Sequence, residues 1–259
     1  MPEFSANLST LFREYDLIDR PRAAAEAGFR AVEMQFPYEV DCSALAAILK
    51  DHALAVSVIN VPCGDFVEGG EGNAALPGRT GDFRDSVALA RDYAEALGAC
   101  NVNILAGAPS VDHDTAQTTL AGNLHHAAAV FAEIGVGVVV EAINTVDRAG
   151  FFLNTADAVI DIIDRADHPN LGLQFDLYHM AMMDLPLVET YRKHADRIGH
   201  IQFADAPGRH EPGTGKIDFA PIFAAIDASR YDGWVAAEYF PVNGTENGLD
   251  WMTAFSRNA

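Results

Sequence analysis

LGLQFDLYHM, at residues 171–180, joins a β-prone run to two side chains that can carry chemistry. The first five residues favour a buried strand. The run ends at Asp176, and His179 follows three positions later. A buried strand that terminates in a carboxylate needs a physical reason, and the pattern of elements around it supplies one.

Seven other short runs share this β-prone character, at residues 3–8, 31–36, 54–61, 101–107, 136–143, 200–205 and 234–240. Segments with helical spacing alternate with them, at residues 19–28, 41–52, 83–98, 123–135, 155–166 and 219–229. Eight strand–helix units in this length predict a (β/α)₈ TIM barrel, an α/β fold, as one domain over residues 1–259.

A doubly wound sheet is the second fold that the alternation allows. It usually needs fewer strands for this length, and the chain lacks a phosphate-binding fingerprint. Gly135-Val136-Gly137 is the only G-x-G opening near a strand, and Val140 occupies the place of its third glycine. The barrel is therefore favoured.

Charge excludes several classes of partner. The 37 acidic and 17 basic side chains give a formal net charge of −20. Nucleic acid and anionic membrane surfaces are bound chiefly by clustered cations, so neither is an expected partner. A small anionic substrate remains compatible, because one or two local cations plus a metal can reverse the field inside a pocket.

The cysteines and the amino terminus indicate a reducing compartment. Cys42, Cys63 and Cys100 are odd in number and widely spaced, so they suggest neither a disulfide framework nor a CxxC zinc site. The opening MPEFSANLST has no basic and apolar signal regions, and no run of 18 uncharged apolar residues occurs. We expect a soluble cytoplasmic protein.

Barrel geometry explains the carboxylate at the end of the strand. Active sites of such barrels lie at the carboxyl ends of the strands, where Asp176 would point at the substrate. Glu141, Gln202 and Glu238 occupy corresponding places on neighbouring strands. Three carboxylates crowded together would repel one another unless a divalent cation held them, and oxygen ligands favour Mg²⁺ or Mn²⁺.

Further polar residues are candidates for substrate binding. His179 would lie in a loop just past Asp176, and His200 would share the interior face of its strand with Gln202 because side chains alternate with period two. Arg209 is a rare cation in the Gly/Pro-rich segment after that strand, and Glu211 could orient it.

Asn7, Asn60 and Asn103 lie near strand ends, where each could bind substrate or cap the next helix. His125 and His126, adjacent on a predicted helix, are expected at the solvated surface. The Gly-rich segment at residues 63–82 is the longest irregular stretch, and it is either a mobile surface loop or a lid.

The chain resembles the hydroxypyruvate isomerase family among the xylose-isomerase-like barrels. The stretches that carry the resemblance are FSANLSTLFREYD (4–16), VEMQFPYE (32–39), LPGRTGDFRD (76–85), VEAIN (140–144), FDLYHM (175–180), GHIQFADAPGRHEPGTGKID (199–218) and GWVAAEY (233–239). Related ketose epimerases typically place a histidine ligand where this chain has Gln202, which agrees with the hydroxypyruvate branch.

The resemblance implies an isomerase that interconverts hydroxypyruvate and tartronate semialdehyde through an enediolate. It implies that Glu141 and Glu238 move the proton, and that both join Asp176 and Gln202 as metal ligands. His179 and Arg209 would hold oxygens of a 2-oxo acid or sugar-acid substrate. The family also suggests a homo-oligomer.

Four other functions can be weighed against the sequence. A 2-oxo-tetronate isomerase or a ketose 3-epimerase would use the same residues on a longer substrate. A noncatalytic sugar-acid binding protein would use overlapping groups, although the intact pair of glutamates argues against it. A DNA-repair nuclease on this fold would be expected to carry several more histidine ligands and a basic face, which this chain lacks.

Overall fold

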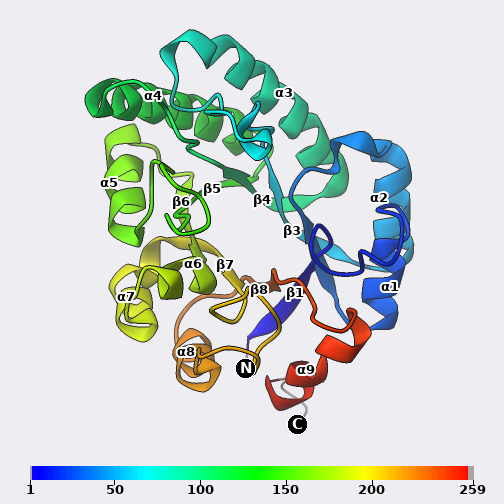
Figure 1. Ribbon diagram of the computed structural model, residues 1–259. Helices are drawn as coiled ribbons and strands as arrows, with labels where there is room; N and C mark the ends of the chain where they lie inside the picture. Colours follow the sequence, from blue (N-terminus) through cyan, green and yellow to red (C-terminus); the bar gives the residue numbers. More distant parts are fainter. Residues whose placement is uncertain (1, 256–259) are drawn as a thin grey trace.

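The computed structural model describes residues 2–255 and consists of a closed barrel of eight strands surrounded by helices (Figure 1). All eight strands pair in parallel and in chain order, and the first pairs with the last to close the barrel. The strands are β1 (Glu3–Asn7), β2 (Ala31–Met34), β3 (Ala55–Asn60), β4 (Ala99–Ile104), β5 (Gly137–Glu141), β6 (Leu171–Asp176), β7 (Ile198–Phe203) and β8 (Trp234–Ala237). The predicted TIM barrel is confirmed.

The helices follow the strands around the barrel as Figure 1 shows. They are α1 (Arg20–Glu26), α2 (Cys42–Asp51), α3 (Thr80–Leu97), α4 (His113–Ala132), α5 (Ala156–Ala166), α6 (Leu177–Met182), α7 (Leu187–His194), α8 (Phe219–Asp227) and α9 (Asp250–Phe255). Within residues 2–255, no helix is both long and apolar enough to span a bilayer.

Strand positions agree with the sequence pattern, and three helices lie outside the helical segments named from the sequence: α6, α7 and α9. His179 consequently lies in helix α6 and not in a loop. The reason is local, because the Asp176 Oδ1 atom accepts a hydrogen bond from the Tyr178 backbone N–H at 2.8 Å and caps the helix at the strand end.

Period-two alternation along β7 separates the core from the barrel interior. The Phe203 ring packs outward against Phe223 of α8 and Trp251 of α9, with centroid distances of 5.4 and 5.1 Å. His200 and Gln202 point the other way, into the barrel, and both are buried. The predicted interior face of this strand is therefore confirmed.

The segment at residues 63–82 is folded against the barrel. It contains two 3₁₀ turns, Phe66–Glu68 and Pro77–Arg79, and the Arg79 guanidinium binds the Asp65 carboxylate at 2.8 Å. Phe66 is buried at 5% exposure, while the adjacent Val67 is 49% exposed. The segment therefore forms an ordered wall beside the carboxyl ends of the strands.

Candidate active site

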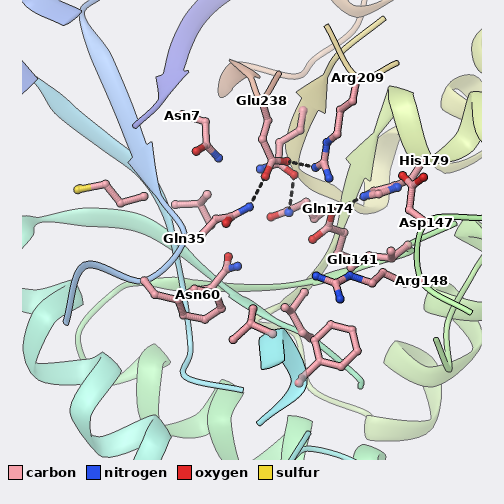
Figure 2. A pocket seen from close by; sticks show the side chains of 18 residues that line it. Asn7, Gln35, Asn60, Glu141, Asp147, Arg148, Gln174, His179, Arg209 and Glu238 are labelled. Carbon is pink, nitrogen blue, oxygen red and sulfur yellow. Dashed lines mark hydrogen bonds and ion pairs between the residues drawn. The ribbon is translucent and has the colours of Figure 1, made fainter. Parts of the chain in front are cut away.

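A cavity of about 110 Å³ lies among the carboxyl ends of the strands (Figure 2). Six side chains that the sequence marked as catalytic or substrate-binding candidates contribute to its lining: Asn7, Asn60, Glu141, His179, Arg209 and Glu238. Gln202, the predicted metal ligand of β7, also lines it. Its volume lies well below the roughly 300–1,000 Å³ of pockets that take drug-sized ligands, so it suits a molecule of a few carbons.

Three buried carboxylates come from the ends of three strands. Glu141 ends β5, Asp176 ends β6, and Glu238 directly follows β8; none is more than 5% exposed. Burial raises the pKa of Glu141 well above its ordinary value, and the negative charges of Glu238 and Asp176 raise it further. Burial likewise raises the pKa of Asp176, against the lowering effect of Arg209.

Two neighbouring side chains compensate the negative charge of Glu238. Burial raises its pKa to about 7, while Arg209 and a hydrogen bond from Gln35 act in the opposite direction. The Arg209 Nη2 atom lies 3.0 Å from Glu238 Oε2, and the Gln35 amide donates to Glu238 Oε1 at 2.5 Å. The ionised form of Glu238 therefore has two direct partners.

Arg209 is directed into the acidic cluster from the segment after β7. Its backbone φ of 57° lies in the left-handed region, which costs energy in a residue with a side chain. Its guanidinium contacts Asp176 Oδ2 at 3.8 Å and lies 5.2 Å from the centre of the Tyr178 ring. Burial alone would lower the pKa of Arg209, but the surrounding carboxylates, Glu238 foremost, raise it above its ordinary value.

Asp205 holds the segment that presents Arg209. Its buried carboxylate accepts hydrogen bonds at 2.8–3.0 Å from four backbone N–H groups, those of Ala206, Gly213, Gly215 and Ile217. Gly215 is required there, because an added Cβ would overlap the Ala206 carbonyl oxygen. Glu211 does not orient Arg209 as expected; its carboxylate instead accepts a hydrogen bond from the Val242 N–H at 3.1 Å.

His179 presents a defined tautomer to the carboxylates. Its Nδ1 faces two donors of Asn144, the side-chain amide at 2.7 Å and the backbone N–H at 3.4 Å. The Asn144 amide cannot be reversed without loss, since its Oδ1 accepts from the N–H groups of Val146 and Asp147. Nδ1 is therefore an acceptor, and the proton of the neutral ring is on Nε2.

This tautomer decides how His179 can act. Nε2 lies 3.6 Å from Glu141 Oε1 and 3.6 Å from Asp176 Oδ2, and the three side chains form a cluster with the spacing of a metal site. A histidine that binds a metal normally donates its other ring N–H to an acceptor, whereas here Nδ1 meets donors. We therefore assign His179 as a hydrogen-bond donor. Burial, aided by Arg209, lowers its pKa well below the ordinary value and keeps the ring neutral.

Glu33 of β2 is a further buried carboxylate inside the barrel, which the sequence reasoning missed. It is 0% exposed and accepts hydrogen bonds from Asn7 at 2.7 Å, Gln202 at 2.7 Å and His200 at 2.6 Å. His200 thus contacts Glu33 and is not among the residues that line the cavity. A glutamate inside the apolar run at residues 31–36 was the available signal.

Amide side chains complete the interior layer. The Gln202 Oε1 atom accepts a hydrogen bond from Gln174 Nε2 at 2.6 Å, and Asn103 donates to Glu141 Oε2 at 2.9 Å. Asn103 therefore supports a carboxylate and caps no helix. Among buried side-chain atoms in residues 2–255, Asp176 Oδ2, Gln174 Oε1, Asn103 Oδ1 and Arg209 Nε make no hydrogen bond. Buried polar atoms seldom lack partners, so these atoms suggest a bound group.

Other residues at the cavity were not expected from the sequence. Gln35, Gln174, Asp147 and Arg148 all line it, the last two from the connection between β5 and α5. His125 and His126 lie outside the cavity lining, on α4, as expected of surface residues; the His125 ring contacts the Ala166 carbonyl at 2.8 Å.

Comparison with known proteins places this geometry in a family. The family model of the xylose isomerase-like TIM barrel matches residues 21–255. The chain is 42% identical to hydroxypyruvate isomerase of Escherichia coli K12 over 98% of this chain and 100% of that protein. It is 40% identical to 2-oxo-tetronate isomerase of Cupriavidus necator over 98% and 99% of the two chains.

A solved structure from Brucella melitensis, described as an AP endonuclease of family 2, superposes with a TM-score of 0.95. It shares 38% identity with this chain and is covered over 99% of its length, against 98% here. The barrel, the carboxylates at its mouth and these full-length similarities agree: the chain belongs to the xylose isomerase-like TIM barrel family, among the isomerases related to hydroxypyruvate isomerase and 2-oxo-tetronate isomerase.

Proposed function

We propose that the protein interconverts hydroxypyruvate and tartronate semialdehyde. The observation that carries the proposal is the pair of buried carboxylates, Glu141 and Glu238, which line one small cavity from β5 and from the end of β8 (Figure 2). An isomerase of this kind needs one group to remove a proton from carbon and another to return one. Relatives at 42% and 37% identity are named hydroxypyruvate isomerase and putative hydroxypyruvate isomerase, which supports the substrate.

The reaction moves hydrogen between adjacent carbons without any external reagent. A base removes a proton from C3 of hydroxypyruvate, the C3–H electron pair forms the C2=C3 bond of an enediolate, and the carbonyl oxygen at C2 takes the negative charge. A proton then returns to C2, and the proton of the C3 hydroxyl passes to the oxygen on C2, so that C3 becomes the aldehyde and C2 carries the new hydroxyl. Atoms and charge balance with two proton-transfer groups and donors at the C2 oxygen.

The two glutamates have different surroundings, and this difference suggests which one removes the proton and which one returns it. Arg209 and Gln35 stabilise the ionised form of Glu238, so Glu238 is the base that takes the C3 proton. Glu141 has only the Asn103 amide as a hydrogen-bond partner among the described residues, and its pKa is raised well above the ordinary value, mainly by burial. Glu141 is therefore the second proton-transfer group, which returns a proton to C2.

His179 and Arg209 act on substrate oxygens. The Nε2–H of His179 faces the carboxylate end of the cavity, and the buried Nε of Arg209 has no partner. Both are donors, and donors placed where negative charge develops stabilise an enediolate. Because Arg209 also neutralises Glu238 and Asp176, its charge serves the reacting end of the substrate.

The donor set fits a divalent cation. Besides burial, the charges of Glu238 and Asp176 raise the pKa of Glu141, and the charge of Asp176 raises the pKa of Glu238. Asp176 Oδ2 lacks any hydrogen bond. Gln202 adds an amide oxygen at the same cavity. We propose these four residues as ligands of Mg²⁺ or Mn²⁺, since oxygen donors suit these ions. A bound cation would polarise the substrate carbonyl and stabilise negative charge on its oxygen.

A 2-oxo-tetronate isomerase is the second candidate. It is favoured by the relatives of that name at 40%, 38% and 34% identity, each matched over nearly its whole length. The same pair of glutamates would carry the proton, with one more carbon in the substrate. The nuclease description of the Brucella structure has no matching zinc cluster here: within residues 2–255, the one metal-like group found contains a single histidine.

Turnover in D₂O tests the proposal. The purified protein is incubated with hydroxypyruvate, with a four-carbon 2-oxo-tetronate and with an uncharged ketohexose, before and after chelation of divalent metals. Proton transfer through a base that exchanges with solvent should place deuterium at C2 of tartronate semialdehyde. Deuterium no higher than in the enzyme-free control, with no product from hydroxypyruvate, would contradict the proposed function.

A further inference from the structure

Two arginines line the cavity, and they differ in their charge partners. The difference leaves the binding of a substrate carboxylate to an arginine other than Arg209. Arg209 is engaged with Glu238 and Asp176 at the reacting end. Arg148 lines the same cavity from the connection between β5 and α5, and Figure 2 shows its guanidinium turned inward. We propose that Arg148 binds the carboxylate of the substrate and makes the enzyme selective for 2-oxo acids over uncharged ketoses.

Arg148 lacks a carboxylate partner. Within residues 2–255, no aspartate or glutamate lies within ion-pair distance of its guanidinium. The nearest acid in sequence, Asp147, is held by other groups: its Oδ2 accepts from the Tyr178 hydroxyl at 2.8 Å and from the Asn144 amide at 3.0 Å. The positive charge of Arg148 is therefore available to a ligand.

The turn that carries Arg148 is ordered. The side-chain oxygen of buried Asn144 accepts hydrogen bonds from the backbone N–H groups of Val146 and Asp147. Its backbone carbonyl oxygen accepts a hydrogen bond from the Arg148 N–H at 3.2 Å. The same Asn144 side chain contacts Nδ1 of His179 at 2.7 Å. One asparagine thus positions both the cation at the rim and the donor at the reacting end, which fixes the spacing between two contacts of one substrate.

Phe66 supports the side chain from the other side. The Arg148 guanidinium carbon lies 5.5 Å from the centre of the Phe66 ring, in cation–π contact. Phe66 belongs to the wall at residues 63–82, which the ion pair between Arg79 and Asp65 closes at 2.8 Å. A stacked guanidinium keeps its edge donors free, and these donors suit a carboxylate bidentately.

Electrostatics requires such a cation. The described lining contains three acids, Glu141, Asp147 and Glu238, in a chain of formal charge −20. A 2-oxo acid brings another negative charge, which these groups repel. Arg209 is already matched by Glu238, so the charge that admits the substrate carboxylate is that of Arg148. This inference rests on the proposed function, because it names the end of the 2-oxo acid that the reacting groups do not hold.

Arg148→Gln tests the assignment, with Arg13→Gln as the matched control. Arg13 is also an exposed arginine over a phenylalanine ring, 5.7 Å from the centre of Phe240, and it does not line the cavity. The expected result for Arg148→Gln is a KM for hydroxypyruvate raised roughly ten- to a hundredfold, the range for a lost charged hydrogen bond, with kcat within about twofold. Arg148→Lys should recover part of the loss.

A binding measurement separates failure of this inference from failure of the proposed function. Glycerate carries the carboxylate of hydroxypyruvate but cannot isomerise in the same way, and its dissociation constant can be measured by calorimetry. Arg148→Gln should weaken glycerate binding by the same factor, whether or not hydroxypyruvate is turned over. Wild type that fails to bind glycerate, or Arg148→Gln with unchanged KM and glycerate affinity, would overturn the assignment of Arg148.

Discussion

The floor and the rim of the cavity handle charge in opposite ways. The floor is formed by Glu141, Glu238 and Arg209, with side-chain exposures of 7%, 4% and 22%. Asp176 is 1% exposed and lies beside Arg209, outside the cavity lining. Arg148 at the rim is exposed, and its neighbour Val146 is 68% exposed. Both regions use charged side chains within one small cavity.

The difference in burial indicates which region suits proton transfer and which suits substrate recognition. In the floor, burial makes every charge depend on its neighbours, so the pKa values of Glu141 and Glu238 rise above their ordinary values, which suits proton transfer. At the rim, water and salt screen the charge, so it contributes to recognition and changes pKa values little. We therefore propose that the floor carries the chemistry and the rim the selectivity.

Removing either carboxyl group of the proposed catalytic pair should have the largest effect. Glu238→Gln and Glu141→Gln should each lower kcat on hydroxypyruvate by at least about a hundredfold, because each deletes a proton-transfer group. The double variant should be little worse than either single one. Steady-state kinetics checks this, with the exposed Glu189→Gln on α7 as control. Near wild-type kcat in both single variants would refute the mechanism.

Asp176→Asn should sharply weaken binding of Mn²⁺. Losing a direct ligand should cost at least the roughly 10- to 100-fold that follows loss of an outer-shell partner. The fold should survive, because asparagine also caps a helix and can keep the hydrogen bond to the Tyr178 N–H. Calorimetry measures the affinity, and Asp164→Asn, at a surface ion pair with Arg197, is the control. Equal affinity in Asp176→Asn and wild type would remove Asp176 from the ligand set.

Affinity for Mn²⁺ should rise with pH up to about neutrality. Burial raises the pKa of Glu238 to about 7 and that of Glu141 well above its ordinary value, so protons compete with metal at these carboxyls. Below about pH 7 the affinity should fall up to about tenfold per pH unit for each proton displaced. Calorimetry in two buffers of different ionisation enthalpy counts the protons released. Affinity independent of pH between 5.5 and 7.5 would argue against these ligands.

The rim should respond more weakly when its support is removed. Phe66→Leu deletes the ring beneath Arg148, and an exposed cation–π contact contributes about 0.5–1 kcal/mol, or roughly a two- to fivefold rise in KM for hydroxypyruvate. The kcat should stay constant. Phe240→Leu, which deletes the ring beneath Arg13, controls for the loss of a similar contact away from the cavity. A fall in kcat would mean that Phe66 serves the floor.

Local pattern was sufficient to predict the barrel and most residues of the candidate site. Strand and helix periodicity located the eight strands, and barrel geometry then brought Glu141, Gln202 and Glu238 to one cavity. Local pattern was not sufficient for Glu33. In the sequence it is a single polar residue in an apolar run, and only the fold brings three hydrogen-bond donors from other strands to its carboxylate. Because His200 contacts Glu33, its side chain is not part of the cavity lining.

The order of elements and the residue types at the strand ends therefore follow from local pattern, because periodicity acts within a few residues of the chain. The partners of those side chains depend on the closed barrel. Arg209 meets Glu238, Asn144 sets the tautomer of His179, and Asp205 closes the segment around Arg209. Each of these contacts joins residues distant in sequence or depends on backbone direction, and their energies depend on burial that forms only when the barrel closes.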